Sequence, residues 1–226
     1  GITLYYLLEN IALTMTTASN VGIIITIAPF FTALFSTVFL KSEKPGILFY
    51  IGFLAAIAGV ALISSNGGSA LEWNPLGDLL AILAAIAWSG YSILTRKISN
   101  LGYNTIQTTR RVFLYGLLFM VPMLFFMDFH LEPIQLTSPE NLGNILFLGF
   151  GASALCFVTW NTAVKRLGAV KTSVYIYLVP IVTLAASVLV LHEPLTPVLV
   201  VGTVLTLVGL WLSETKLFAK KLLTLS

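Results

Sequence analysis

Residues 174–193 read VYIYLVPIVTLAASVLVLHE, an almost unbroken apolar run with Pro180 in its first half. A similar run, IIITIAPFFTALFSTVFLKSE, occupies residues 23–43 and carries Pro29. A proline inside a helix removes one backbone N–H donor and presses on the preceding turn, so it interrupts the helix that holds it. Two prolines at matching places in two apolar runs indicate a structural device that the chain contains twice.

The composition around these runs is that of a membrane protein. Hydrophobic residues make up 58% of the chain and charged residues only 9%, whereas an ordinary soluble domain has about 25% charged residues. A bilayer core is crossed by about 20 apolar residues in a helix. The runs are apolar on every face, which disfavours the alternating pattern of a membrane β-barrel. The sequence therefore predicts an all-α polytopic membrane protein.

Eight apolar segments are long enough to be predicted as transmembrane helices. Their predicted bounds are 2–15, 21–40, 46–64, 76–95, 112–127, 144–164, 172–191 and 198–213.

Positive charge is distributed unevenly between the connections that join these segments. All twelve Lys and Arg residues fall on alternate connections or on the C-terminal tail. The positive-inside rule then predicts that these connections and the C-terminus are cytoplasmic. Because anionic lipid head groups account for such flanking charge, the net charge of +3 does not indicate a nucleic-acid partner.

The opening pair of prolines belongs to an internal repeat. Asn10 and Asn161 are separated by 151 residues, as are Pro29 and Pro180. The paired segments stand an odd number of crossings apart, so the two copies are predicted to face in opposite directions. Such inverted repeats characterise many secondary transporters.

The repeat also predicts how the chain is divided. The segments at 76–95 and 112–127 have no counterparts after Gly1, so we expect a ten-helix parent with about 75 further residues before it. The predicted parts are the rest of a first repeat at 1–65, an outer linker at 66–75, a second repeat at 76–214 and a basic cytoplasmic tail at 215–226.

Four stretches carry a family resemblance: TTASNVGIIITIAPFFTALFSTVFLKSE, GFLAAIAGVALI, GDLLAILAAIAWSGYSILTRKI and GAVKTSVYIYLVPIVTLAASVLVLHEPLTPVLVVGTVLTLVGLWL. In these residues the chain resembles the drug/metabolite transporter superfamily, in particular its EamA type. The resemblance implies inverted five-helix repeats in a ten-helix carrier of the inner membrane. It also implies transport of amino acids or similar small metabolites, often outward.

Pro29 and Pro180 each lie about nine residues into a segment, near the middle of the bilayer at 1.5 Å per residue. Each leaves the carbonyl four residues earlier without its helical donor, so that this group needs another partner or a wet cavity. We hypothesise paired kinks or pivots beside the solute path. The alternative is that each proline is tolerated in its membrane helix and only packs against neighbouring side chains.

Glu9 and Asn10 stand in an otherwise apolar segment. A carboxylate in lipid costs about 2.5–3.5 kcal/mol on insertion scales, so Glu9 should be protonated, paired or facing water. Solute binding and proton coupling both use such a group, and a purely structural hydrogen bond is the alternative.

Aromatic and amide side chains recur near the middle of later segments. Asn161 is a candidate for solute contact or for an interhelical hydrogen bond. The aromatic residues can form a cage for an organic solute or anchor the helices at the membrane interface. These aromatic candidates are Trp88, Tyr91, Trp160, Tyr175 and Tyr177.

Small residues recur at helical spacing in 46–64 and in its repeat mate 198–213, which predicts close helix packing. Glu43 and Glu193 begin short turns before the next helices. They are predicted to cap those helices or to interact with the dipole at their N-termini, with gating as the alternative. The single cysteine, Cys156, is expected to be buried.

No motif of an enzyme, cofactor site or metal site is present in the sequence, so we predict no enzymatic activity, no cofactor and no metal. The predicted function is alternating-access transport of a small-molecule solute, with the lipid bilayer as a partner and a homodimer allowed. The alternative is a membrane subunit or scaffold that packs against another protein without transporting anything.

Overall fold

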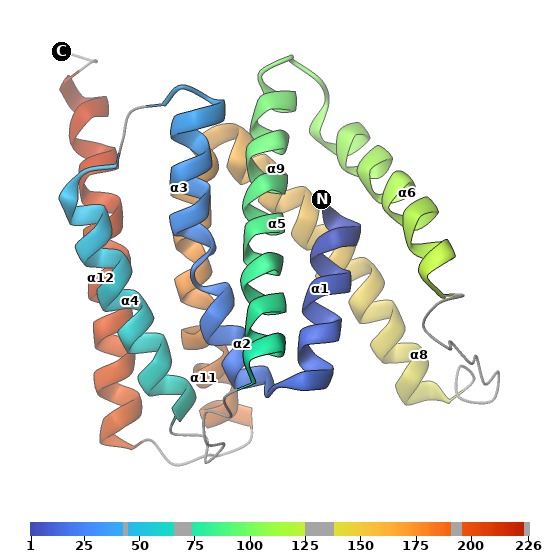
Figure 1. The fold of residues 1–226 in the computed structure, drawn as a ribbon, viewed down its shortest axis with the longest axis horizontal. Helices are drawn as coiled ribbons and strands as arrows, with labels where there is room; N and C mark the ends of the chain where they lie inside the picture. The colour runs from blue at the N-terminus through green and yellow to red at the C-terminus, as the bar shows by residue number, and fades with distance from the viewer. Residues whose placement is uncertain (43–44, 66–73, 125–137, 191–195, 224–226) are drawn as a thin grey trace.

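The computed structural model describes residues 1–42, 45–65, 74–124, 138–190 and 196–223. These residues form a bundle of helices without a strand in any described range (Figure 1). The elements are α1 (Ile2–Met15), α2 (Ala18–Ile25), α3 (Ala28–Phe39), α4 (Ile47–Ser65), α5 (Pro75–Ser99), α6 (Thr105–Leu124), α8 (Pro139–Leu146), the π-helical η1 (Phe147–Leu155), α9 (Cys156–Leu167), α10 (Ala169–Val174), the 3₁₀ turn η2 (Tyr175–Tyr177), α11 (Leu178–Val190) and α12 (Pro197–Leu223).

Each of the eight predicted segments contains helix, and the described chain is apolar and all-helical as predicted. Four helical stretches are long and apolar enough to cross a membrane: 20–39, 75–99, 139–167 and 197–214. Three shorter apolar helices cover 2–15, 47–63 and 169–182. The count of eight crossings stays a prediction.

The predicted boundary of one segment is wrong by seven residues. The segment expected to start at Val112 begins at Thr105, so Arg110 and Arg111 lie within α6 rather than in a connection. Asn104 explains the early start, because its side-chain oxygen accepts the backbone N–H groups of Ile106 and Gln107. A side-chain acceptor just before a helix satisfies donors that have no helical partner.

The segment expected at 21–40 is two helices rather than one continuous helix. It breaks at Thr26 and Ile27, between α2 and α3, and Pro29 lies in the first turn after the break. The segment expected at 172–191 breaks in the same way, since η2 separates α10 from α11 and Pro180 lies in the first turn of α11. Both interruptions lie just before a proline, where the helical hydrogen-bond ladder lacks one donor.

Helices α4 and α12 run side by side in opposite directions at one edge of the bundle (Figure 1). A Cβ atom added to Gly52 would lie 2.5 Å from the carbonyl oxygen of Gly209. One added to Gly59 would lie 2.6 Å from the carbonyl oxygen of Gly202. Only glycine permits this backbone-to-backbone approach, so the small residues hold the two helices together as predicted.

Helix α5 lies inside the bundle and packs against α1, α2, α3 and α9. Its inward face is formed mainly by small side chains, among them Ala81, Ala85 and Ser89, which are fully buried. Small residues bring neighbouring helices close, and the larger Trp88 and Tyr91 pack at two further inward positions of α5. Those positions carry the candidate site.

Large apolar side chains cover the outside of the bundle. Phe147 and Phe150 of η1 are 70% and 73% exposed, and α6 presents Phe119 at 68%. Cys156 is also exposed, so the expectation that it is buried was wrong. Lipid tails are as apolar as a protein interior, and an apolar residue therefore has no need to turn inward in a membrane helix.

Several predicted features fall outside the described residues. Glu43, Glu193 and most of the linker at 66–75 are among them. The predicted tail at 215–226 begins as a continuation of α12, which runs to Leu223.

Candidate functional site

Five aromatic side chains meet where α1, α5 and α9 come together: Tyr5, Trp88, Tyr91, Phe157 and Trp160, called the aromatic cluster below. Trp88 is at its centre. The Trp88 ring centroid lies 4.9 Å from that of Tyr5, 5.6 Å from that of Phe157 and 5.1 Å from that of Trp160. Tilted and edge-on contacts at such distances are favourable for aromatic rings.

A chain of hydrogen bonds ties the cluster to α6. The Tyr91 hydroxyl donates to Asn161 Oδ1 at 2.8 Å, and Asn161 Nδ2 donates to Thr109 Oγ1 at 2.9 Å. All three side chains are buried. The chain therefore joins α5, α9 and α6 through buried groups, and the loss of Asn161 would leave the Tyr91 hydroxyl without this acceptor.

Glu9 joins the cluster through one neighbour. The Tyr5 hydroxyl donates to Glu9 Oε1 at 2.8 Å, one helical turn along α1. Glu9 is half-buried, and the Tyr5 hydroxyl is a hydrogen-bond partner for its carboxyl group. A partner of this kind is one of the three arrangements that the sequence argument allowed for an acid in an apolar segment.

The remaining candidate side chains lie elsewhere. Asn10 is exposed on α1. Tyr177 is fully buried, but it packs with Ala33 of α3 and Phe49 of α4 in a separate apolar cluster. Tyr175 is 36% exposed, on the η2 turn that also contacts α12. The structure thus brings together Glu9, Trp88, Tyr91, Trp160 and Asn161, and it does not bring Asn10, Tyr175 or Tyr177 into that group.

The two helix breaks approach the site in different ways. Beside Pro29, the carbonyl oxygen of Ala28 accepts hydrogen bonds from the hydroxyls of Ser89 (2.8 Å) and Thr32 (2.9 Å). Ser89 directly follows Trp88 on α5, so this break is hydrogen-bonded to the helix that carries the cluster. The second break places the fully buried Tyr177 three residues before Pro180.

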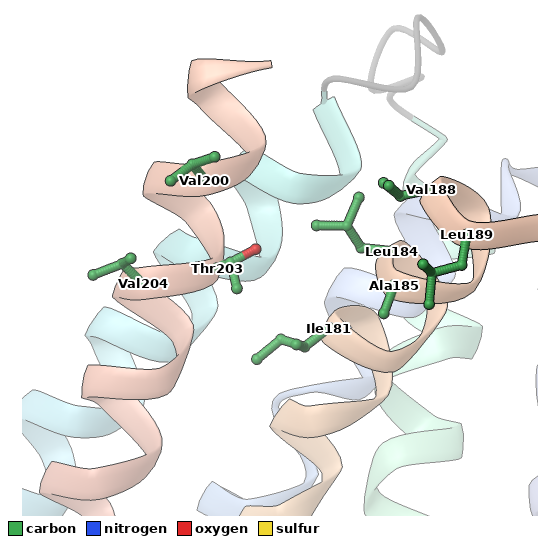
Figure 2. A pocket seen from close by; sticks show the side chains of 8 residues that line it. All are labelled: Ile181, Leu184, Ala185, Val188, Leu189, Val200, Thr203 and Val204. Carbon is green, nitrogen blue, oxygen red and sulfur yellow. The ribbon is translucent and has the colours of Figure 1, made fainter. Parts of the chain in front are cut away.

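A cavity of about 360 Å³ lies between α11 and α12 (Figure 2). Apart from Thr203 its lining is aliphatic, including Ile181, Leu184 and Val204. The Thr203 hydroxyl donates to the carbonyl of Leu199 at 2.7 Å within its own helix. The cavity therefore presents no spare polar group with which to select a solute, and it shares no residue with the aromatic cluster.

Comparison with known proteins identifies the chain. The family model described as the EamA-like transporter family matches residues 1–65 and 75–215. The chain belongs to this family.

Individual relatives agree with the assignment. An uncharacterized transporter of Archaeoglobus fulgidus is 31% identical over 96% of this chain and 73% of its own length. A probable terminal-alkyne amino-acid exporter of Streptantibioticus cattleyicolor is 29% identical over 98% of this chain and 72% of its own length. A crystal structure with 20% sequence identity superimposes with a TM-score of 0.79 over 98% of this chain and 75% of that one, which shows the same fold.

This EamA-family protein is thus a multi-pass membrane transporter of the drug/metabolite transporter superfamily, as the resemblance in its sequence implied. Members of the family and the named relatives are transporters rather than enzymes.

Sequence reasoning missed three residues that the transporter uses to build the site. Tyr5 holds Glu9, and the spacing of four residues on one helix was a signal that identifies such a pair. Thr109 was overlooked because the predicted segment started after it. Phe157 contacts Trp88, Tyr91 and Phe113, and nothing in its sequence context distinguishes it from other apolar residues.

Proposed function

We propose that this transporter carries small organic, amino-acid-like solutes outward across the cell (inner) membrane by alternating access between two inverted repeats, at residues 1–65 and 76–214. The observation that carries the proposal is the position of the aromatic cluster. Tyr5 comes from α1 in the first half, and it meets Trp88 of α5 in the second half. Transporters built from inverted repeats bind their solutes at the interface between the repeats.

The contact between α4 and α12 supports the inverted arrangement. Gly52 corresponds to Gly202 in the repeat, and Gly59 corresponds to Gly209. Gly52 contacts Gly209, and their counterparts in the repeat, Gly202 and Gly59, also contact each other. The repeat therefore maps one contact onto the other. A two-fold relation between the halves has this property, and the antiparallel course of the two helices is the one that inversion requires.

The broken helices support a pivoting role for Pro29 and Pro180. Both interruptions occur at corresponding places, and irregular backbone at membrane depth is tolerated where it is buried in protein or lines a cavity. In the proposed cycle each half bends at its break while the α4–α12 contact stays closed. Tyr175 and Tyr177, beside the second break, would then reach the solute path in a conformation other than the one described here.

The kind of solute and its direction are inferred from a relative. The Streptantibioticus cattleyicolor protein is named as a probable amino-acid exporter, which supports an amino-acid-like solute that moves outward. A paired carboxylate at Glu9 supports recognition of a solute amine or coupling to protons.

Transport by the purified protein in liposomes tests the proposal. Vesicles loaded with a panel of unlabelled amino acids and amino-acid amides should accumulate the matching radiolabelled compound from outside, at a rate that saturates with concentration. Protein-free vesicles and vesicles of the Asn161→Leu variant are the controls. Absence of saturable exchange for the whole panel would overturn the proposal and favour a non-transporting membrane subunit.

Topology is tested separately by thiol labelling. Cys156 is first replaced by alanine, and single cysteines are then introduced at Glu43 and Glu193. A membrane-impermeant maleimide applied to intact cells should label position 193 and spare position 43. Labelling of both positions from the same side would rule out the inverted repeat.

A further inference from the structure

Two hydrogen-bond donors at the centre of the aromatic cluster have no acceptor. The indole nitrogens of Trp88 and Trp160 are buried, and neither has a hydrogen-bond partner within the described part of the chain. Their rings lie 5.1 Å apart on α5 and α9. A buried indole N–H normally finds an acceptor, so two adjacent ones without any are an exception that needs an explanation.

The acceptors beside them are already engaged. Asn161 Oδ1 accepts from Tyr91, and Glu9 Oε1 accepts from Tyr5. Tyr6 also packs into the cluster, and its hydroxyl is hydrogen-bonded with Ser153. The side chains of Phe157, Phe113 and Val112 have no oxygen. The unpaired N–H groups therefore call for an oxygen that a bound molecule brings.

The charged side chains near the two indoles limit the chemical class of that bound molecule. Among the described residues, the ring contacts of the two indoles are all with other aromatic rings, and none is with Lys, Arg or His. The ring of Tyr5 contacts Trp88, and the hydroxyl of Tyr5 donates to the carboxyl group of Glu9. An acid therefore lies one side chain away from the indoles. A buried anion needs a compensating positive group, and a carboxylate placed here would have none while facing a second carboxylate. An uncharged oxygen avoids this penalty and still accepts both N–H groups.

We propose that Trp88 and Trp160 form a donor pair for an uncharged carbonyl oxygen on a flat solute. The flat part of the solute stacks against the rings of Tyr5 and Phe157 while its carbonyl accepts from both indole nitrogens. This inference rests on the proposed function, and it names the solute class of the same site: a planar amide or ketone, or an amino acid whose carboxyl group is blocked. A solute that enters must part the two tryptophan rings, and the hydrogen bonds that it makes favour the parted arrangement.

Indole N–H signals in the NMR spectrum of the ¹⁵N-tryptophan-labelled protein test the proposal directly. Benzamide and benzoate are the probes, because they share a size and differ in charge. Benzamide should move the N–H protons of Trp88 and Trp160 downfield, as expected when a hydrogen bond forms, and should leave the exposed Trp211 in place. Benzoate should bind at least about tenfold more weakly.

Replacement of each tryptophan by benzothienylalanine gives the matched variant. This analogue keeps the two-ring shape and substitutes sulfur for N–H. The benzamide Kd should rise about tenfold for each replacement at 88 or 160. The same replacement at 211 is the control and should leave the Kd unchanged.

The outcomes separate this inference from the proposed function. Exchange in liposomes with no benzamide-induced shift of either indole would overturn the donor pair and leave transport standing. Tighter binding of benzoate than of benzamide would overturn the uncharged class. Downfield shifts without any saturable exchange would support the donor pair and count against transport.

Discussion

Two helix contacts in this transporter are built on opposite principles. Between α4 and α12 the backbones touch through glycines, and no large side chain separates them. Between α5 and α9 the helices are held apart by tryptophan, tyrosine and phenylalanine rings and joined by Asn161. The first contact has no room to change, whereas rings and hydrogen bonds can rearrange in steps. We infer that the first contact is the fixed axis of the protein and the second is the part that adapts to a solute.

The largest expected effect comes from filling the α4–α12 contact. A Cβ at Gly209 would lie 2.6 Å from the carbonyl oxygen of Gly52, so Gly209→Val forces the helices apart. The cost exceeds the roughly 1–3 kcal/mol of ordinary overpacking, because backbone atoms cannot move aside. The variant should fail to give a single folded species in size-exclusion chromatography.

Gly22→Ala is the matched control for this substitution, because no atom lies within 4 Å of a Cβ at that position. Normal yield and a normal elution profile are expected for it. A folded and active Gly209→Val protein would contradict the idea of a fixed axis.

The next largest effect is expected at the adaptable contact. Asn161→Leu removes the acceptor of the buried Tyr91 hydroxyl and the donor to Thr109, whose hydroxyl still donates to the carbonyl of Thr105. The loss should lower stability by about 1–3 kcal/mol and solute exchange by about tenfold or more. Melting temperature and initial exchange rate measure the two effects.

Tyr115→Phe is the control for this prediction, since Tyr115 is 59% exposed on α6 and its hydroxyl lies outside the cluster. If Asn161→Leu lost stability while keeping the wild-type exchange rate, Asn161 would be structural only.

A smaller effect is expected from straightening the two broken helices. Pro29→Ala together with Pro180→Ala restores the missing backbone donors, which favours continuous helices. If the breaks act as pivots, the exchange rate should fall several-fold while the amount of folded protein is unchanged.

Pro122→Ala is the matched control, because Pro122 lies inside α6 and has no part in either break. An exchange rate that responds to Pro122→Ala as strongly as to the double substitution would remove the pivot hypothesis.

The smallest effect is expected at the edge of the adaptable contact. Glu9→Gln keeps an oxygen that can accept from the Tyr5 hydroxyl, so the fold should be unaffected. If Glu9 couples transport to protons, exchange should lose its dependence on pH between about pH 5 and pH 8 while the rate at its plateau changes little. Unchanged pH dependence would exclude Glu9 from coupling.

The repeat and the hydrophobic pattern made much of the fold predictable. The apolar runs identified the described helical segments, and the small residues in 46–64 and 198–213 predicted close helix packing, although not that these two segments are each other's partners. The failures have physical causes. Cys156 was misplaced because membrane helices carry apolar residues on both faces, and the start of α6 was missed because a single capping residue, Asn104, decided it.

The candidate site was predictable only in part. Trp88, Tyr91 and Asn161 stood out as polar or aromatic residues in apolar segments, and they do meet. Tyr177 stood out for the same reason and lies in a different cluster with Phe49. Composition reveals that a side chain is unusual for its segment, but the direction in which it points depends on the rotation of each helix.

The sequence by itself determined the class of the protein, its helical segments and its family, because these depend on local hydrophobicity and on regular spacing along the chain. The tertiary structure alone decided which aromatic rings meet, that Thr109 completes the hydrogen-bonded chain, and that the indoles of Trp88 and Trp160 find no acceptor among the residues that the structure describes. These features depend on how helices far apart in the sequence pack against one another. In a membrane the lipid is as apolar as the protein interior, so hydrophobicity cannot tell one face of a helix from another, and shape and hydrogen bonding make that choice.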